Sequence, residues 1–187
     1  MTDFDFSTFP VLETERLRLR RILPGDIDTW LAIFTHPDVR RYLVDVEENT
    51  QFDTVREIVD WADEIFEHKS GIRWAITLKS DDTMIGSCGF HIYDAHNQKL
   101  EIGYELSKDY WRKGIMTEAC KAVLNFCFDE LKVHRIEADV TVGNEASAGL
   151  LKSLGFTQEG TWRDRVFAGG KFYSLWQFGI LKNEYQR

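Results

Sequence analysis

The chain has 187 residues, of which 43% are hydrophobic and 29% are charged. This is ordinary globular composition, which excludes a disordered or fibrous chain, and the length suits one domain over residues 1–187. The net charge of −8 repels polyphosphate backbones, which excludes a general nucleic-acid binder and favours a cationic partner such as a basic amine.

Cysteine usage and the chain start predict a cytoplasmic protein. Cys88, Cys120 and Cys127 are odd in number and lack CxxC spacing, which disfavours a disulfide framework or a zinc site. The first ten residues are acidic and precede no apolar stretch, so we predict no signal peptide, and no apolar run suits a membrane span. The five histidines show no ligand spacing, so no metal is predicted.

The first element is a strand. "RLRLRR" (16–21) alternates strictly and places Leu17 and Leu19 on one face, with arginines on the other. The arginine face is either a binding patch or, more simply, a solvated strand face.

Two helices follow. "PGDIDTWLAIF" (24–34) predicts a short helix capped by Asp26 and ending near His36. Apolar residues three and four apart predict a second helix over 51–68. Its apolar stripe consists of Phe52, Val55, Ile58, Val59, Ala62, Ile65 and Phe66.

An antiparallel meander comes next, because "RWAITLK", "MIGSCGFHIY" and "KLEIGYELS" read as three strands. Apolar residues from Met116 to Leu131 form one helical stripe, which places Cys120 and Cys127 in the core. "RIEADVTV" predicts a strand, and the step to it from the meander requires a right-handed crossover and a parallel pair. The sheet is therefore mixed.

The last part of the chain predicts a helix and a hairpin. Asn144 offers a cap for a helix through Leu154, and Gly155 is placed to end it in the left-handed conformation. The remaining residues read as strands joined by a turn at Gly169-Gly170.

The segment "YWRKGIMTEA" (110–119) places Gly114 at the start of a helix, behind Arg112 and Lys113. A glycine there lets a ligand approach the first helical N–H groups, which lack acceptors and attract anions. The segment is neither a Walker A loop nor a GxGxxG turn, so nucleotide hydrolysis is disfavoured. By itself the motif is equally consistent with a simple turn.

Combined with "NEASAGLLKSLGF" (144–156), the segment 101–119 resembles the acetyl-CoA-binding core of the GNAT superfamily of N-acetyltransferases. The closer likeness is to its RimJ/RimL-type branch, which acetylates protein N-terminal amines, and it runs from about Thr14 to Tyr185. Further markers are "ETERLRLR", "IGS" and "EG..RD". The resemblance implies an α+β fold in α/β/α layers: a mixed, mostly antiparallel sheet of about seven strands with a splayed parallel pair, and four helices.

The resemblance also implies where acetyl-CoA binds. The pantetheine arm would lie between the splayed strands and bond to backbone groups of Glu105, Leu106 and Ser107. The pyrophosphate would bind the loop at Gly114, where Met116 replaces the family's small residue and must turn its side chain into the core. The residues expected at the cofactor are Glu105, Leu106, Ser107, Arg112, Lys113, Gly114, Ile115, Met116, Thr117, Asn144 and Ser147.

Catalytic roles carry over at two positions. Glu101 matches the strand glutamate beside the substrate amine and is the first candidate for the general base, although a solvated strand carboxylate explains it equally well. Ser147 matches the serine that reaches the cofactor sulfur. The family's tyrosine position holds Leu151, and its later glutamate position holds Val166, with Asp164 nearby in a different register.

The reading is an acetyl-CoA-dependent N-acetyltransferase that acts by direct attack, without an acyl-enzyme. The acceptor is a protein N-terminal α-amine or a small amine such as a polyamine, amino acid or drug. Four aromatic residues of the early helices are candidates either to line the acceptor site or to fill the core: Trp30, Tyr42, Phe52 and Trp61. A non-catalytic acyl-CoA-binding module is the alternative. The resemblance makes a homodimer plausible, with "KFYSLWQF" as a candidate surface.

Overall fold

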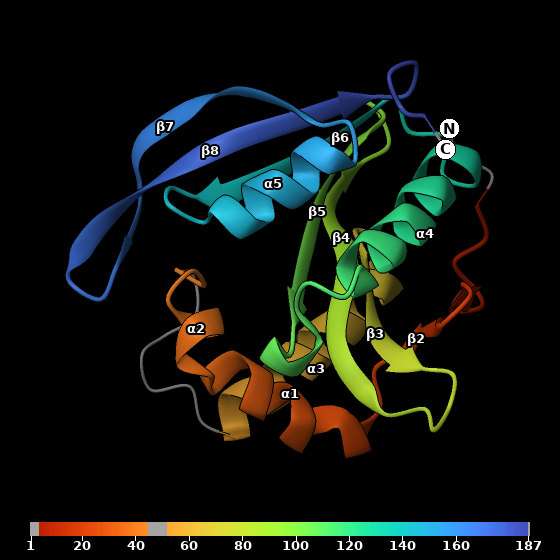
Figure 1. Ribbon diagram of the computed structural model, residues 1–187. Coiled ribbons are helices and arrows are strands. Elements are labelled where there is room, and N and C mark those ends of the chain that lie inside the picture. The colour runs from red at the N-terminus through yellow and green to blue at the C-terminus, as the bar shows by residue number, and fades with distance from the viewer. Residues whose placement is uncertain (1–3, 45–51, 187) are drawn as a thin grey trace.

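The fold is a single sheet with helices on both faces, seen in a computed structural model that describes residues 4–44 and 52–186 (Figure 1). The described residues form eight strands in the order β1-β2-β3-β4-β5-β6-β8-β7. The strands are β1 (Leu12–Glu13), β2 (Leu17–Arg21), β3 (Ile72–Leu78), β4 (Met84–Asp94), β5 (Lys99–Leu106), β6 (Arg135–Thr141), β7 (Thr157–Ala168) and β8 (Lys171–Leu181). The helices are α1 (Ile27–Thr35), α2 (Pro37–Arg40), α3 (Phe52–Glu67), α4 (Ile115–Asp129) and α5 (Glu145–Ser153), with 3-10 turns η1 (Pro24–Asp26) and η2 (Lys108–Tyr110).

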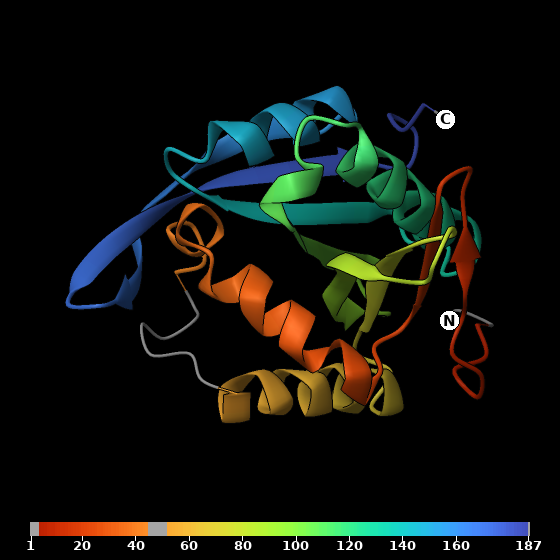
Figure 2. The same ribbon diagram turned by 60° about the horizontal axis from the view of Figure 1, so that its bottom comes forward.

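The layers are those expected. Helices α4 and α5 cover one face of the sheet, and α1 and α3 cover the other (Figure 2). All sheet pairs are antiparallel except β5 with β6, which confirms the mixed sheet with one parallel pair. Within the described residues, no helix combines the length and the apolar character that crossing a membrane requires.

The sheet has one strand more than the expected seven, because β1 has two residues and its length gives no alternation signal. The short helix α2 was likewise not anticipated, and it leaves four long helices as expected. Helix α3 confirms the helix predicted over 51–68, although Gln51 and the side chains of Phe52, Val55 and Ile58 lie outside what the structure describes.

Strand β2 confirms its predicted inner face, since Leu17 and Leu19 are fully buried. Its outer face is less solvated than expected. Arg20 donates to both carboxylate oxygens of Asp26, at 2.7 and 3.1 Å, and also pairs with Asp82. The sequence predicted that the Asp26 side chain caps α1, and this is wrong. The carboxylate instead accepts from Arg20 and from the Leu23 N–H.

The parallel pair β5/β6 is short. The two strands are paired at Lys99 with Arg135, Leu100 with Ile136 and Glu101 with Glu137. Beyond that point β5 stays paired with β4 as far as Leu106, and β6 stays paired with β8 as far as Thr141. The strands therefore diverge, as the family resemblance implied, and divide the sheet into a first half-sheet (β1–β5) and a second half-sheet (β6, β8, β7) (Figure 1).

A buried polar cluster fixes the end of β5. The Glu105 carboxylate accepts from the Arg73 guanidinium, the Ser87 hydroxyl and the Trp30 indole N–H, the last at 2.7 Å. Arg73 also donates to Ser87 Oγ at 2.6 Å. A buried ion pair is stable when its remaining bonding groups are satisfied, and here they join α1, β3 and β4 to β5.

We predict that Glu105→Gln destabilises the fold by about 3 kcal/mol or more, because it leaves the Arg73 guanidinium buried without a counter-charge. Urea unfolding followed by circular dichroism measures this. The matched control is Asp63→Asn, which removes an ion pair with Arg21 whose side chains are 41% and 44% exposed. That change should alter the unfolding free energy by about 1 kcal/mol or less. Equal effects of the two variants would contradict a structural role for the cluster.

Candidate active site

The backbone of β5 beyond Ile102 presents an open edge. In an antiparallel ladder, alternate residues turn their N–H and C=O groups toward the partner strand. The Ser107 N–H bonds Ile85 O at 2.8 Å, so by alternation Glu105 also faces β4, whereas Tyr104 and Leu106 face away from it. Glu105, Leu106 and Ser107 were expected to offer backbone groups to the cofactor, and of these Leu106 lies on the open edge. Tyr104, which was not expected, lies there too.

The loop after β5 is held against that edge. The Trp111 indole N–H donates to Leu106 O at 2.9 Å, which ties the loop to the strand end. Arg112 has φ 57° and Gly114 has φ 73°, so the chain turns through the left-handed region twice before α4. At the second position a glycine avoids the steric penalty that a side chain incurs there.

Helix α4 begins with free amides. Gly114 is its N-cap, no side chain of the described residues caps it, and the first helical bond runs from Glu118 N to Gly114 O. The N–H groups of Ile115, Met116 and Thr117 therefore lack helical acceptors. The Met116 side chain packs against the core, as expected if these amides are to stay accessible. Such a helix start attracts an anion.

Positive charge surrounds this helix start. Arg112 and Lys113 are exposed beside it, and Lys113 also lies over the Tyr110 ring at 5.3 Å. Arg16, at the start of β2, donates to Lys113 O at 3.0 Å and pairs with Glu118 at 2.6 Å. These bonds clamp the loop to β2 and to α4. Sequence reasoning missed Arg16, because the contact spans about a hundred residues and "RLRLRR" reads as a strand face.

Helix α5 approaches from the second half-sheet. The Asn144 side chain caps it by accepting from the Ser147 N–H at 3.2 Å, which confirms the predicted cap. Gly155 follows it with φ 94°, as its predicted role as terminator requires. In the first turn of α5, Ser147 Oγ lies 2.8 Å from the Tyr104 hydroxyl, so a hydrogen bond links α5 to β5.

Several carboxylates lie where β5 and β6 diverge, on the face of the sheet opposite to Tyr104 and Ser147. Glu101 and Glu137 are the last paired positions of β5 and β6, and Asp139 follows two residues later on the same face of β6. Glu101 Oε1 lies 3.5 Å from His91 Nε2, and the Trp61 ring is 6.3 Å from the His91 ring. Trp61 is 37% exposed, whereas Trp30 is fully buried in the core.

Asp139, an exposed residue of β6, has a raised pKa. Protein atoms around its carboxyl raise the pKa of Asp139 to about 6, and the negative charges of Glu101 and Glu137 add to the rise. Arg165 and His91 act in the opposite direction. Sequence reasoning missed Asp139, because its environment comes from β5 and the β7 bulge.

The other positions weighed from sequence make structural contacts. Leu151 is fully buried, so a core leucine occupies the family's tyrosine position. Val166 pairs with Tyr173 beside a bulge over 163–165, and the Asp164 N–H donates to Ser174 Oγ at 3.0 Å. The three cysteines are buried, which confirms the core placement predicted for Cys120 and Cys127.

Helix α2 braces the open ends of both strands. Asp38 pairs with Lys108, which follows β5. Two residues after α2, the Tyr42 hydroxyl donates to Gly143 O at 3.0 Å, and the Tyr42 carbonyl accepts from Thr141 at 3.1 Å. One segment thus ties the end of β5 to the end of β6.

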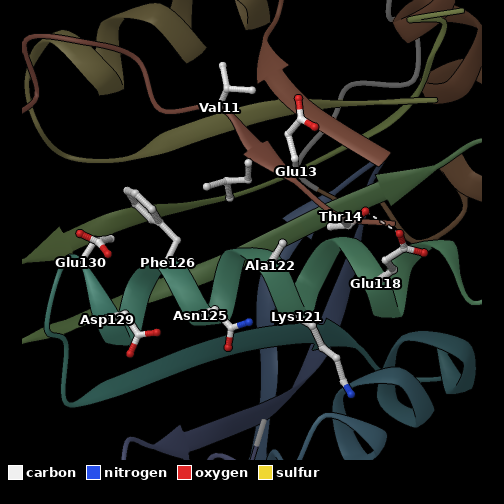
Figure 3. Close-up of a pocket in the computed structure, with 11 residues that line it drawn as sticks. Val11, Glu13, Thr14, Glu118, Lys121, Ala122, Asn125, Phe126, Asp129 and Glu130 are labelled. Atoms are coloured by element: carbon white, nitrogen blue, oxygen red, sulfur yellow. Dashed lines mark hydrogen bonds between the residues drawn. The ribbon is translucent and has the colours of Figure 1, made fainter. Parts of the chain in front are cut away.

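A separate groove of about 520 Å³ lies between β1 and α4 (Figure 3). Its lining residues come from segments 11–14 and 118–130, so it stands apart from the divergence. Glu118 connects the two regions, since it accepts from Thr14 Oγ1 at 2.5 Å on the groove side and binds Arg16 on the other.

Comparison with known proteins identifies the class. The model of the acetyltransferase (GNAT) domain family matches residues 16–157. The uncharacterized N-acetyltransferase p20 of Bacillus licheniformis is 34% identical over 93% of this chain and 97% of its own. The [ribosomal protein uS5]-alanine N-acetyltransferase of Escherichia coli is 29% identical over 56% of each chain. This chain therefore belongs to the GNAT family of acetyltransferases, and its acyl donor is acetyl-CoA.

Solved structures agree on the fold. The crystal structure of a probable acetyltransferase superposes with a TM-score of 0.82 at 29% identity, covering 94% of this chain and 99% of that one. The spermidine N-acetyltransferase of Vibrio cholerae, solved with CoA and spermine, gives 0.79 at 20% identity, with 92% and 99% covered. RimL, a ribosomal L7/L12 α-N-protein acetyltransferase solved with coenzyme A, gives 0.82 at 17% identity, with 92% and 98% covered.

We predict that Glu101→Gln lowers the pKa of Asp139 below about 6, because it removes a nearby like charge. NMR titration of the Asp139 carboxyl carbon measures the change. Glu145→Gln, on the exposed first turn of α5, is the control and should leave the titration in place. An Asp139 that titrates near ~4 in the unaltered protein would contradict the electrostatic description.

Proposed function

We propose that this enzyme acetylates the N-terminal α-amine of a protein, with the carboxylates on the divergence as the acceptor site. The observation that carries the proposal is the position of Asp139, two residues beyond the last β5/β6 pair and on the same face of β6 as Glu137. Its pKa, raised to about 6 by desolvation and by neighbouring carboxylates, suits it to accept a proton. A base of that strength is better matched to an α-amine, which titrates near ~8, than to an alkyl amine near ~10. The uS5-alanine relative supports the same acceptor class.

The residues present fit acetyl-CoA. The amides of Ile115, Met116 and Thr117 suit its pyrophosphate, with Arg112 and Lys113 able to pair with further phosphate oxygens. The backbone groups of Tyr104 and the N–H of Leu106 suit the amides of the pantetheine arm, with Asn144 close to its far end; the Leu106 carbonyl already accepts from Trp111. In this proposal the buried Glu105 side chain and the Ser107 N–H support the site and do not contact the cofactor.

The mechanism is direct transfer. Acetyl-CoA supplies an activated acyl carbon whose bond to sulfur breaks as the amine nitrogen bonds to it. Glu101 attracts the ammonium form to the acceptor site, and Asp139 takes one of its protons to give the free amine. The second proton, which the nitrogen loses after attack, passes to the leaving thiolate to give the free thiol. Ser147 donates a hydrogen bond to the sulfur as it becomes negative, and the first-turn amides of α5 add to that stabilisation. Glu101 is thus a binding residue, and Asp139 replaces it as the proposed base.

A small polyamine is the second candidate acceptor. The carboxylates Glu101, Glu137 and Asp139 would attract its charges, and the spermidine N-acetyltransferase of Vibrio cholerae shares the fold. The sequence left open a non-catalytic acyl-CoA-binding module as an alternative. Membership of an acetyltransferase family argues against that alternative.

We further propose that residues 1–187 form one domain, because all eight strands of the described residues join one sheet. The three buried thiols suit a reducing cytoplasm. A homodimer would use the β7/β8 hairpin, where Phe167 and Phe172 are 63% and 61% exposed with ring centroids 4.8 Å apart.

The cofactor proposal predicts that the double change Arg112→Gln and Lys113→Gln weakens CoA binding about tenfold, because two charge-assisted contacts are lost. Isothermal titration calorimetry with CoA measures it, and the deficit should shrink at high salt. Lys182→Gln, an exposed charge after β8, is the matched control. An unchanged affinity in the double variant would place the phosphates elsewhere.

The acceptor proposal is tested by thiol release from acetyl-CoA with short peptides that begin with Ala, Ser or Met, and with spermidine. We expect peptides with a free α-amine to be turned over and their N-acetylated forms to be inert. Asp139→Asn should slow peptide turnover by about 100-fold, as expected when a general base is removed. If spermidine is turned over and none of the peptides is, this proposal is wrong and the acceptor is a polyamine.

A further inference from the structure

The Tyr104 side chain is the feature that the mechanism above leaves unused. Tyr104 lies on β5, where its backbone faces the open edge, and its hydroxyl lies 2.8 Å from Ser147 Oγ in the first turn of α5. The contact therefore joins the first half-sheet to the helix that connects β6 and β7 of the second. The side-chain hydroxyl and the backbone amide of Tyr104 therefore both lie where β5 and β6 diverge.

We propose that Tyr104 is a positioning residue: its hydroxyl donates to Ser147 Oγ and so leaves the single serine proton free to bond the leaving sulfur. This rests on the proposed role of Ser147. The tyrosine position of the family is occupied by Leu151, so the phenol here reaches the serine from a different element and orients it without giving up its proton.

The direction of the bond follows from what each hydroxyl needs. Tyr104 is partly buried, and desolvation of its hydroxyl by the surrounding protein raises its pKa far above the usual value, so it stays protonated and needs an acceptor for that proton. Its other polar neighbours include the buried thiols of Cys88 and Cys120, which are weak acceptors. Ser147 Oγ is the strong acceptor that the described residues provide.

The consequence falls on Ser147. A serine hydroxyl has one proton and two lone pairs. If Ser147 donated to Tyr104, its proton would be used and the phenol proton would be left buried without a strong partner. With Tyr104 as donor both needs are met, and the serine becomes a better donor because the two bonds polarise one another.

A double-mutant cycle tests the proposal. We expect Tyr104→Phe to lower the rate of thiol release about tenfold with the KM for acetyl-CoA within about twofold, since the cofactor's backbone contacts remain. The acceptor is whichever peptide or amine the unaltered enzyme turns over fastest in the thiol-release test above. The variant with both Tyr104→Phe and Ser147→Ala should be no slower than Ser147→Ala alone. Tyr93→Phe, a partly buried tyrosine elsewhere in the core, is the control.

The outcomes separate the two proposals. If Ser147→Ala keeps the full rate, the role of Ser147 fails and that of Tyr104 with it. If Ser147→Ala is slow while Tyr104→Phe keeps the full rate, or if the two losses multiply, the positioning role alone is overturned.

A second variant tests the proposal if the Tyr104→Phe protein does not fold. Replacement of Tyr104 by 3-fluorotyrosine keeps the hydroxyl but makes it more acidic and therefore a stronger donor. The rate should stay the same or rise if Tyr104 donates to Ser147. A fall would contradict a donor role for Tyr104 and overturn the proposal.

Discussion

The brevity of the β5/β6 pairing is the constraint on which the site depends. Each strand is fully bonded on its other side, β5 to β4 and β6 to β8, so each must follow its own half-sheet once the pairing ends at Glu101 and Glu137. Unpaired backbone at a sheet edge has to find partners, because buried N–H and C=O groups are rarely left unsatisfied. The pantetheine arm of acetyl-CoA offers such groups, which is why we propose the divergence as its binding site.

Both half-sheets contribute chemistry at that point. On one face, Asp139 of β6 and Glu101 of β5 make an acidic environment for an amine. On the other, Tyr104 of β5 and Ser147 of α5 share a hydrogen bond at the expected position of the sulfur. Contacts of Asp38 and Tyr42 with the residues after β5 and β6 bridge the open ends of the two strands.

Local signals in the sequence predicted much of this structure, because caps and turns depend on adjacent residues. Gly114 at the start of α4, Asn144 as the cap of α5 and Gly155 as its terminator all follow from such rules. The residues that sequence reasoning missed owe their importance to distant partners: Arg16 to Glu118, Asp139 to Glu101, and Tyr104 to Ser147. Alternation places each of these on a face, but cannot show which side chain another strand or helix brings against it.

Amide hydrogen exchange with and without CoA tests the central claim most directly. The divergence, if it holds the cofactor, predicts slower exchange at the N–H groups of Tyr104 and Leu106 and of the first turn of α4, with little change in α3. Protection confined to the groove between β1 and α4, with Tyr104 and Leu106 exchanging as before, would contradict the account.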